Sequence, residues 1–472
     1  MTAIKHLAGQ TAIYGIPSVL GRVLGYLLVP LYTYIFKTSD YGTVNVFYAY
    51  TSFLMVILTY GMETTYFRFN EHEPDKKKVF STGMISLIIS SVIFLAIILV
   101  FSGDVARWID YPDHPEYVKW FAWILTLDAI SAIPFACLRA QNRPVRFAWI
   151  KMTNITVNIG LNLFFLLLCP FLLSHYSEGF FVKFIASFYR PHWGIEYIFV
   201  SNLIASAVTV FMLLPQISSV RWKIHPDLWK KMLWYAFPLL FAGMAGIVNE
   251  TFDRLLLRYL LPKDIASSQV GIYSACYKIS ILMTIFIQAY RYAAEPFFFA
   301  QAKEKNAREV YAKIMDYFII IVSLIFLVTM LFLDDFILPV LVRSKEYWEG
   351  KGVIPVLLMA NLFLGVYYNL SIWYKLTAKT SWGAWLSLIG AVITLVLNFW
   401  WIPLSPEHLI SGYYGSAWAT FICYGSMMIL SYLIGQKYFP VKYNLIKFGG
   451  YLGLSVLLYG ISSMIKPDVA VI

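Results

Sequence analysis

Cysteine, histidine and charged side chains are all scarce in this chain, and each scarcity excludes a class of function. Of its 472 residues, 4 are cysteine and 7 are histidine. The cysteines show no metal-ligand spacing, so we expect small buried side chains rather than a metal or redox centre. Charged residues make up 13% of the chain and hydrophobic ones 60%, which leaves little material for a soluble domain.

Long polar segments are also missing. The longest links between apolar stretches, about residues 173–195 and 293–313, are too short to fold as catalytic domains. No glycine-rich phosphate loop precedes a Lys-Ser or Lys-Thr pair, which argues against ATP binding. We therefore expect neither an enzyme nor a protein with a cofactor.

Residues 1–10 are too short, and the apolar stretch after them is too long, for a cleavable signal peptide.

Apolar stretches of membrane-spanning length fill the chain instead. A bilayer core takes about 20 apolar residues of helix to cross. The candidate spans are roughly 12–35, 42–62, 80–102, 118–138, 149–172, 196–215, 233–257, 269–292, 314–333, 353–373, 382–402, 413–434 and 446–465. The sequence thus predicts an all-α integral membrane protein with 12–14 transmembrane helices, of which 13 can be counted. Since that count is odd, we expect Ile472 to be external or to be followed by another helix.

Basic residues are distributed unevenly around these spans. If the N-terminus is cytoplasmic, the cytoplasmic links hold roughly twice as many Lys and Arg as the outer links, as the positive-inside rule requires. The net charge of +11 then reflects contact with anionic lipid headgroups rather than with nucleic acid. A multi-pass protein of a cell membrane, with its N-terminus inside, follows from this distribution.

The sequence predicts an internal repeat, because the span pair from Ile16 and the pair from Phe237 share one pattern. Each has an early proline, small residues, a long apolar helix, and then a glycine followed six residues later by a tyrosine (Gly42 with Tyr48, Gly271 with Tyr277). Six helices separate the two starts, so the halves would share one orientation around an axis along the membrane normal. The alternative is chance similarity between two apolar segments. We expect lobes at 1–215 and 233–434, a cytoplasmic link at 216–232 and an extra helix in 435–472.

Several of these segments resemble a known family. Arg22 with Asp40-Tyr41-Gly42, the run 252–257 (FDRLLL), the run 270–275 (VGIYSA) and the Pro296-Phe297 pair are similar to the polysaccharide transporters of the multidrug/oligosaccharidyl-lipid/polysaccharide superfamily. The resemblance implies two six-helix lobes, related by pseudo-twofold symmetry, around a central cavity. It also implies transport of lipid-linked sugars across the bacterial inner membrane by alternating access.

Charged residues at membrane depth are the candidate site. From the helix rise of about 1.5 Å per residue, Arg22, Asp128 and Lys278 lie near the middle of their spans, with Asp253 and Arg254 nearer the outer end. A cation facing lipid at the midplane costs at least about 2.5 kcal/mol. One interpretation is a cationic cavity for a diphosphate, because Arg and Lys both bind phosphate. The other is structural neutralisation, Asp253 with Arg254 or Asp128 with Arg22.

A row of amides lies in the fifth span. Asn154, Asn158 and Asn162 follow the i, i+4, i+8 spacing that places them on one helical face. Amides donate and accept hydrogen bonds, so such a row suits sugar hydroxyls. Hydrogen bonding between helices is the alternative use of Asn in membranes.

The function that the family resemblance implies is that of a flippase for an undecaprenyl-diphosphate-linked oligosaccharide, used in building cell-surface polysaccharide such as the O-antigen of lipopolysaccharide. A MATE-like multidrug antiporter is the first alternative, and a membrane O-antigen polymerase or ligase is the second. The expected partners are the lipid-linked oligosaccharide, membrane lipids and other polysaccharide-assembly proteins. Coupling to protons or to sodium stays open.

Overall fold

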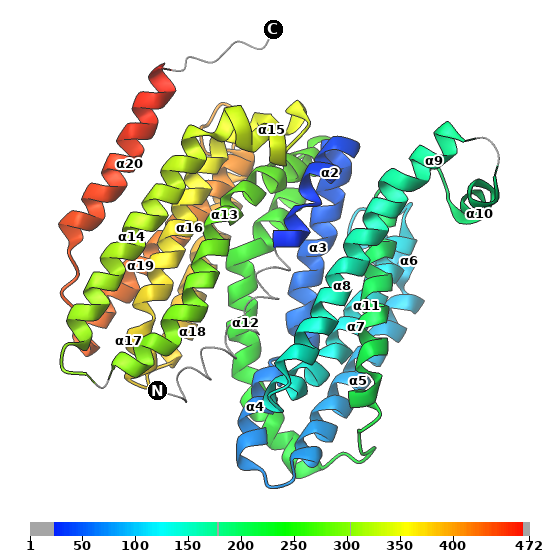
Figure 1. The fold of residues 1–472 in the computed structure, drawn as a ribbon, viewed down its shortest axis with the longest axis horizontal. Coiled ribbons are helices and arrows are strands. Elements are labelled where there is room, and N and C mark those ends of the chain that lie inside the picture. The colour runs from blue at the N-terminus through cyan, green and yellow to red at the C-terminus, as the bar shows by residue number, and fades with distance from the viewer. Residues whose placement is uncertain (1–22, 177–178, 303, 466–472) are drawn as a thin grey trace. The chain divides into compact units, whose positions relative to one another are not determined.

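The computed structural model describes residues 23–176, 179–302 and 304–465, and within these ranges the regular structure is all helical (Figure 1). The predicted all-α class is confirmed. The α-helices are α2 (Val29–Ile35), α3 (Thr38–Thr59), α4 (Met62–His72), α5 (Lys76–Val100), α6 (Ser102–Trp108), α7 (Pro115–Ala140), α8 (Pro144–Leu163), α9 (Cys169–His175), α10 (Phe180–Phe188), α11 (Glu196–Ile217), α12 (Pro226–Leu260), α13 (Lys263–Gln301), α14 (Ala307–Leu331), α15 (Leu338–Leu341), α16 (Val353–Leu370), α17 (Ile372–Leu376), α18 (Ser381–Trp401), α19 (Gly412–Tyr438) and α20 (Leu445–Ile465).

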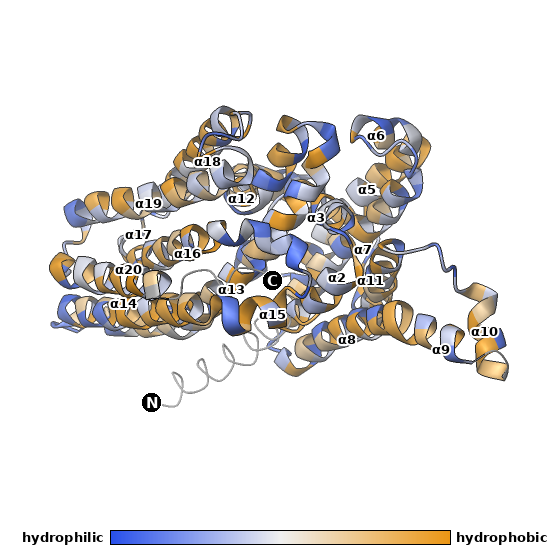
Figure 2. Ribbon diagram, turned by 90° about the horizontal axis from the view of Figure 1, so that it is seen from above, coloured by the Kyte–Doolittle hydropathy of each residue, from blue (hydrophilic) through white to orange (hydrophobic). Residues whose placement is uncertain are grey.

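Within the described residues, 12 helices are long and apolar enough to cross a membrane. Some of them join two labelled helices, as α3 joins α4 and α8 joins α9. Hydrophobic residues predominate along α8 and α14 (Figure 2). Residues 12–22 of the first predicted span, 12–35, lie outside the described residues, and its described part is a shorter apolar helix, Val23–Ile35. The expected thirteenth span therefore stays a prediction.

Contacts between residues divide the chain into two compact units. Among the described residues, the smaller unit contains 23–25 and 47–244, and the larger unit contains 26–46 and 245–465. Helices α3 and α12 each run without a break through a boundary between the units. The lobe boundaries and the pseudo-twofold symmetry expected from the sequence concern membrane topology, and both stay predictions.

In the smaller unit, α7 packs against α5 and α11, and α11 also packs against α8. Buried Met84, Leu87 and Ile133 belong to the apolar core between α5 and α7. Charged groups outside this core are paired: Arg221 Nη1 lies 3.2 Å from Asp75 Oδ2, and Arg139 contacts Glu63. The apolar faces of these helices thus hold the unit together, and the charged pairs lie at the helix ends.

In the larger unit, α19 packs against both α16 and α18, while α16 also packs against α13. A buried cluster that includes Trp373, Leu386, Cys423 and Tyr424 fills the space between α16, α17, α18 and α19. The last helix, α20, packs against α14 at the edge of this unit, and only 6% of its apolar window is buried (Figure 1). We expect the rest of α20 to face lipid, since it is long and apolar enough to span the membrane.

The two glycines singled out by the repeated pattern meet each other in the larger unit. A Cβ atom on Gly42 of α3 would lie 1.7 Å from the Ser267 carbonyl oxygen of α13. A Cβ atom on Gly271 of α13 would lie 1.9 Å from the Thr38 carbonyl oxygen of α3. The Thr38 and Ser268 hydroxyls are also hydrogen-bonded, at 2.7 Å. The contact is reciprocal, because Ser267 lies four residues before Gly271 and Thr38 lies four residues before Gly42. A contact across a local twofold axis has this form.

Two expected links turned out to contain helix. Helix α13 continues to Gln301 and α14 begins at Ala307, so most of the expected link 293–313 is helical. The expected link 173–195 contains α10, whose Phe180 and Phe181 are exposed. Both segments mix charged or polar residues with aromatic ones, which lowers hydropathy without preventing helix formation. Hydropathy therefore placed these helix ends wrongly.

Proline shapes two helices locally. A π-helical turn, Phe164–Leu168, precedes Pro170, and a second one, Leu333–Ile337, precedes Pro339. Proline has no N–H to donate, so the hydrogen-bond ladder changes register just before it. These turns let the helices continue past a residue that would otherwise break them.

Candidate functional site

The buried pair Asp253 and Arg254 lies on α12, in the larger unit. The guanidinium Nη1 of Arg254 donates to Asp253 Oδ1 at 3.0 Å and to the Glu250 carbonyl oxygen at 3.0 Å. The other carboxylate oxygen of Asp253 accepts a 2.5 Å hydrogen bond from the Tyr273 hydroxyl of α13. Both charged side chains are more than 90% buried. Such a pair is stable only because each charge meets the other and further hydrogen bonds satisfy the remaining atoms.

Tyrosine rings of α13 surround this pair. Tyr273 and Tyr277 are four residues apart and therefore share one face of the helix. The Arg254 guanidinium carbon lies 4.4 Å from the Tyr277 ring centroid and 5.8 Å from that of Tyr273, both within the range of cation–π attraction. The aromatic face holds the Arg254 side chain in place beside its ion-pair partner Asp253. The charged pair and the tyrosines belong to two separate sequence motifs, and the structure brings these motifs together in space.

Lys278 follows Tyr277 on α13 and lies at a second tyrosine. Its Nζ lies 5.4 Å from the centroid of the Tyr26 ring, again within cation–π range. The side chain is half-buried. Arg22, the other predicted midplane cation, lies outside the described residues. Two of the predicted cations lie in the described residues, Lys278 on α13 and Arg254 on α12. Each lies against a tyrosine ring.

A polar network beside Arg254 was missed by the sequence reasoning. The Asn249 amide of α12 donates to the Ser387 carbonyl oxygen of α18 at 3.0 Å, and its Oδ1 accepts from the Thr394 hydroxyl at 3.3 Å. The Tyr424 hydroxyl of α19 donates to the Asn249 carbonyl oxygen at 3.1 Å. Hydrogen bonds between membrane helices contribute about 0.6 kcal/mol each on average. This network fixes the end of α12 that carries Arg254 against α18 and α19.

A second missed group lies further along α13. The Arg291 guanidinium carbon lies 3.9 Å from the Tyr368 ring centroid, and Lys375 Nζ lies 2.6 Å from Glu295 Oε1. Arg291 comes 13 residues after Lys278, so the helix rise separates them by roughly 20 Å. Helix α13 therefore has basic residues against tyrosine rings at two depths. An arginine between two tyrosines near the end of a span was the signal available in the sequence.

Asp128 and the amide row lie in the smaller unit. The half-buried Asp128 carboxylate of α7 lies near the Ser206 hydroxyl of α11 and within electrostatic reach of Lys151 of α8. The Asn154 amide donates to the Thr209 hydroxyl of α11 at 2.9 Å. These groups form a polar seam among three helices. Arg22, the suggested partner of Asp128, lies outside the described residues, so this pairing stays a prediction.

The other two amides interact along their own helix. The Asn162 amide donates to the Asn158 carbonyl oxygen at 2.8 Å and to its Oδ1 at 3.0 Å. Asn162 is fully buried, whereas Asn158 is half-buried. Of the predicted row, Asn154 thus makes the helix-to-helix bond that was the alternative interpretation, and Asn154 and Asn158 are both half-buried.

The model of the polysaccharide biosynthesis protein family matches residues 7–302 of this chain. The chain belongs to this family. The match covers both predicted span pairs and confirms the resemblance drawn from their motifs. No curated protein sequence matches the chain significantly.

Solved structures with the same fold are transporters. A structure of the lipid II flippase MurJ in an inward closed conformation has a TM-score of 0.65 and 14% identity, with 97% of this chain and 99% of that chain covered. An inward-facing multidrug resistance MATE family transporter of the MOP superfamily has a TM-score of 0.60 and 13% identity, with 93% and 94% covered. A mutant Vibrio cholerae MATE transporter, VcmN, has a TM-score of 0.60 and 13% identity, with 93% and 98% covered. The chain is thus a member of the polysaccharide biosynthesis protein family with the fold of these membrane transporters.

Proposed function

We propose that this polysaccharide biosynthesis family member flips an undecaprenyl-diphosphate-linked oligosaccharide across the bacterial cytoplasmic membrane by alternating access. The observation that carries the proposal is that Lys278 and Arg254 lie in helices long and apolar enough to span a membrane, each against a tyrosine ring. A diphosphate needs cations in a site with little water, and both side chain types bind phosphate. The tyrosine rings hold these cations in place, Asp253 pairs with Arg254, and Arg22 is proposed to join them.

The remaining polar groups suit the sugar part of such a substrate. Asn158 presents an amide that both donates and accepts hydrogen bonds, as hydroxyl-rich ligands require. Asp253 positions Arg254, and Asp128 is proposed to contact the cargo through its carboxylate. The flippase activity of the similar MurJ structure supports a lipid-linked cargo. A multidrug antiporter is the rival function, supported by the MATE structures and by the acidic Asp128.

Changing Lys278 to alanine is expected to reduce glycan export by about 10- to 100-fold, the effect of losing a hydrogen bond to a charged group. Lys278→Arg keeps the charge and should retain a larger share of export. Arg22→Ala should be as damaging, and Arg22→Lys less so, because the fork geometry is lost while the charge is kept. The measurement is surface glycan in cells whose own copy of the gene is deleted, normalised to the amount of folded protein.

The matched control is Lys230→Ala, which removes an exposed lysine at the start of α12 and should leave export unchanged. Lipid-linked oligosaccharide should accumulate on the inner leaflet in the Lys278→Ala cells. Normal export by both Lys278→Ala and Arg22→Ala at normal protein levels would defeat the cationic site. Intact glycan export in deleted cells, together with a lost resistance to organic cations, would favour the multidrug antiporter.

The proposed orientation makes a separate prediction. Single cysteines at Lys77 and Pro112, both exposed, should react with an impermeant thiol reagent on opposite sides of the membrane. The native cysteines Cys137, Cys169, Cys276 and Cys423 are all buried, so background labelling should be low. In intact cells we expect labelling at position 112 and none at 77. Labelling at 77 but not at 112 would reverse the orientation.

A further inference from the structure

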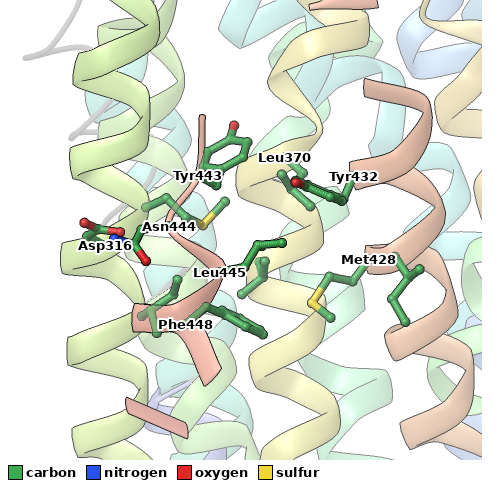
Figure 3. A pocket seen from close by; sticks show the side chains of 12 residues that line it. Asp316, Leu370, Met428, Tyr432, Tyr443, Asn444, Leu445 and Phe448 are labelled. Atoms are coloured by element: carbon green, nitrogen blue, oxygen red, sulfur yellow. The ribbon is translucent and has the colours of Figure 1, made fainter. Parts of the chain in front are cut away.

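A pocket of about 230 Å³ lies within the larger unit, between α20 and the helices α14, α16 and α19 (Figure 3). Its wall is mostly apolar and includes Met315, Leu370, Met428, Leu445 and Phe448. The pocket is larger than the engineered cavity of about 150 Å³ that binds benzene in a soluble protein. It is therefore large enough for part of a hydrocarbon chain.

The pocket adjoins the least buried membrane-spanning helix of the described residues. Only 6% of the apolar window of α20 is buried. Leu445 and Phe448, in the first turn of α20, form one wall of the pocket, and Met428 of α19 forms the opposite one (Figure 3). The pocket thus lies directly beside a helix that we expect to face the lipid of the surrounding bilayer.

Charged and polar groups lie at one end of the same pocket. Lys447 Nζ lies 3.2 Å from Asp316 Oδ2, and both side chains are partly exposed. Lys442 precedes the pocket residue Tyr443 and is exposed. The Tyr443 phenol, whose pKa burial raises further, is neutral and adds no negative charge to this end of the pocket. A basic rim next to an apolar pocket is typical of sites for anionic lipid headgroups on membrane proteins.

We propose that this pocket holds an acyl chain of an anionic phospholipid, whose phosphate is bound by Lys442 and Lys447. An ammonium group has three donors, so Lys447 can contact a phosphate oxygen while it keeps its bond to Asp316. The charge of the rim favours an anionic headgroup over a zwitterionic one, and the apolar wall takes the chain. The site is independent of the proposed flippase function, because Lys278 and Arg254 do not line it.

Photolabelling with a lipid probe tests this site on the full-length protein. The probe is phosphatidylglycerol with a diazirine within one acyl chain, in nanodiscs of phosphatidylcholine, and labelled peptides are mapped by mass spectrometry. We expect label on the pocket residues of α14, α19 and α20. Phosphatidylcholine with the same diazirine should label them about five-fold less, roughly the effect of one lysine near an anionic headgroup.

Variants with matched controls separate the chain site from the headgroup site. Met428→Trp fills the pocket and should reduce its labelling by about ten-fold, whereas Leu433→Trp, at an exposed position on α19 away from the pocket, should not. The double change Lys442→Gln and Lys447→Gln should reduce labelling about ten-fold or more, with Lys437→Gln as control. Asp316→Asn removes the carboxylate that competes for Lys447 and should increase labelling about two-fold.

Several results would overturn the proposal. Equal labelling by both headgroups would remove the role of the lysines. Labelling by a polyprenyl phosphate probe that phosphatidylglycerol fails to displace would assign the pocket to an isoprenoid chain. No label in the pocket would show that no lipid enters it. If Met428→Trp changes folding, as judged by size-exclusion profile and melting temperature, the lysine and Asp316 variants still decide the outcome.

Discussion

Replacing Gly271 with alanine is expected to abolish accumulation of folded protein, because the added methyl group has nowhere to go. The new Cβ atom would lie 1.9 Å from the Thr38 carbonyl oxygen. That oxygen belongs to a helix backbone, so no side-chain rotation relieves the overlap and α3 and α13 must separate. Overpacking a core costs about 1–3 kcal/mol when side chains can adjust. We expect a greater cost here, and Gly42→Ala should behave alike.

The measurement is the yield and melting temperature of detergent-solubilised protein. Gly160→Ala is the matched control, because Gly160 also lies within a membrane helix and a Cβ there meets no other atom within 4 Å. It should be neutral or slightly stabilising, since alanine favours helix by up to about 1 kcal/mol over glycine. The double change at Gly42 and Gly271 should cost less than the sum of the singles, because one separation of the helices relieves both overlaps. Normal yield of Gly271→Ala would show that this crossing is loose.

Replacing Asp253 with asparagine has the second largest expected effect. The change leaves the Arg254 guanidinium buried without its countercharge, and removal of one partner from a buried ion pair costs about 3–5 kcal/mol. The Tyr273 hydroxyl also loses its charged acceptor. We expect low yield and a lowered melting temperature. Asp104→Asn, in the exposed pair with Arg107, is the control and should cost less than about 1 kcal/mol.

A double variant then separates stability from transport. Asp253→Asn with Arg254→Gln removes both buried charges and should restore much of the folded protein, as neutral replacement of buried pairs often does. Glycan export should stay low if Arg254 binds the diphosphate. Restored export along with restored folding would reduce the pair to a structural role. A single Asp253→Asn variant as stable as the natural chain would show that water or another group already compensates Arg254.

Hydropathy was sufficient to predict the all-α membrane class, because a span needs a long apolar run and nothing else in this chain is long enough to compete. It failed where helices continue into polar sequence. Arg291 and Glu295 lower the hydropathy near the end of α13, yet their partners Tyr368 and Lys375 come from elsewhere in the chain. Pairing between distant segments cannot be read from a window of neighbouring residues.

The candidate site was predictable only in part, for the same reason. Asp253 and Arg254 are adjacent in sequence, so their pairing could be considered from the start. The bond from Tyr273 to Asp253, and the bonds of Asn249 to α18 and α19, depend on how helices pack. The repeated pattern identified Gly42 and Gly271 as equivalent positions, but it did not predict that the helices carrying them would contact each other there.

That contact has a consequence for how the gene can vary. Every missense change of one base in a glycine codon adds at least a Cβ atom, so no such change at Gly42 or Gly271 leaves the helix crossing intact. Relief requires a second change at a distant place in the gene that moves the other helix. A saturation scan should therefore find both codons closed to substitution, while the codon for Gly160 accepts alanine. Homologous genes should keep the two glycine codons together.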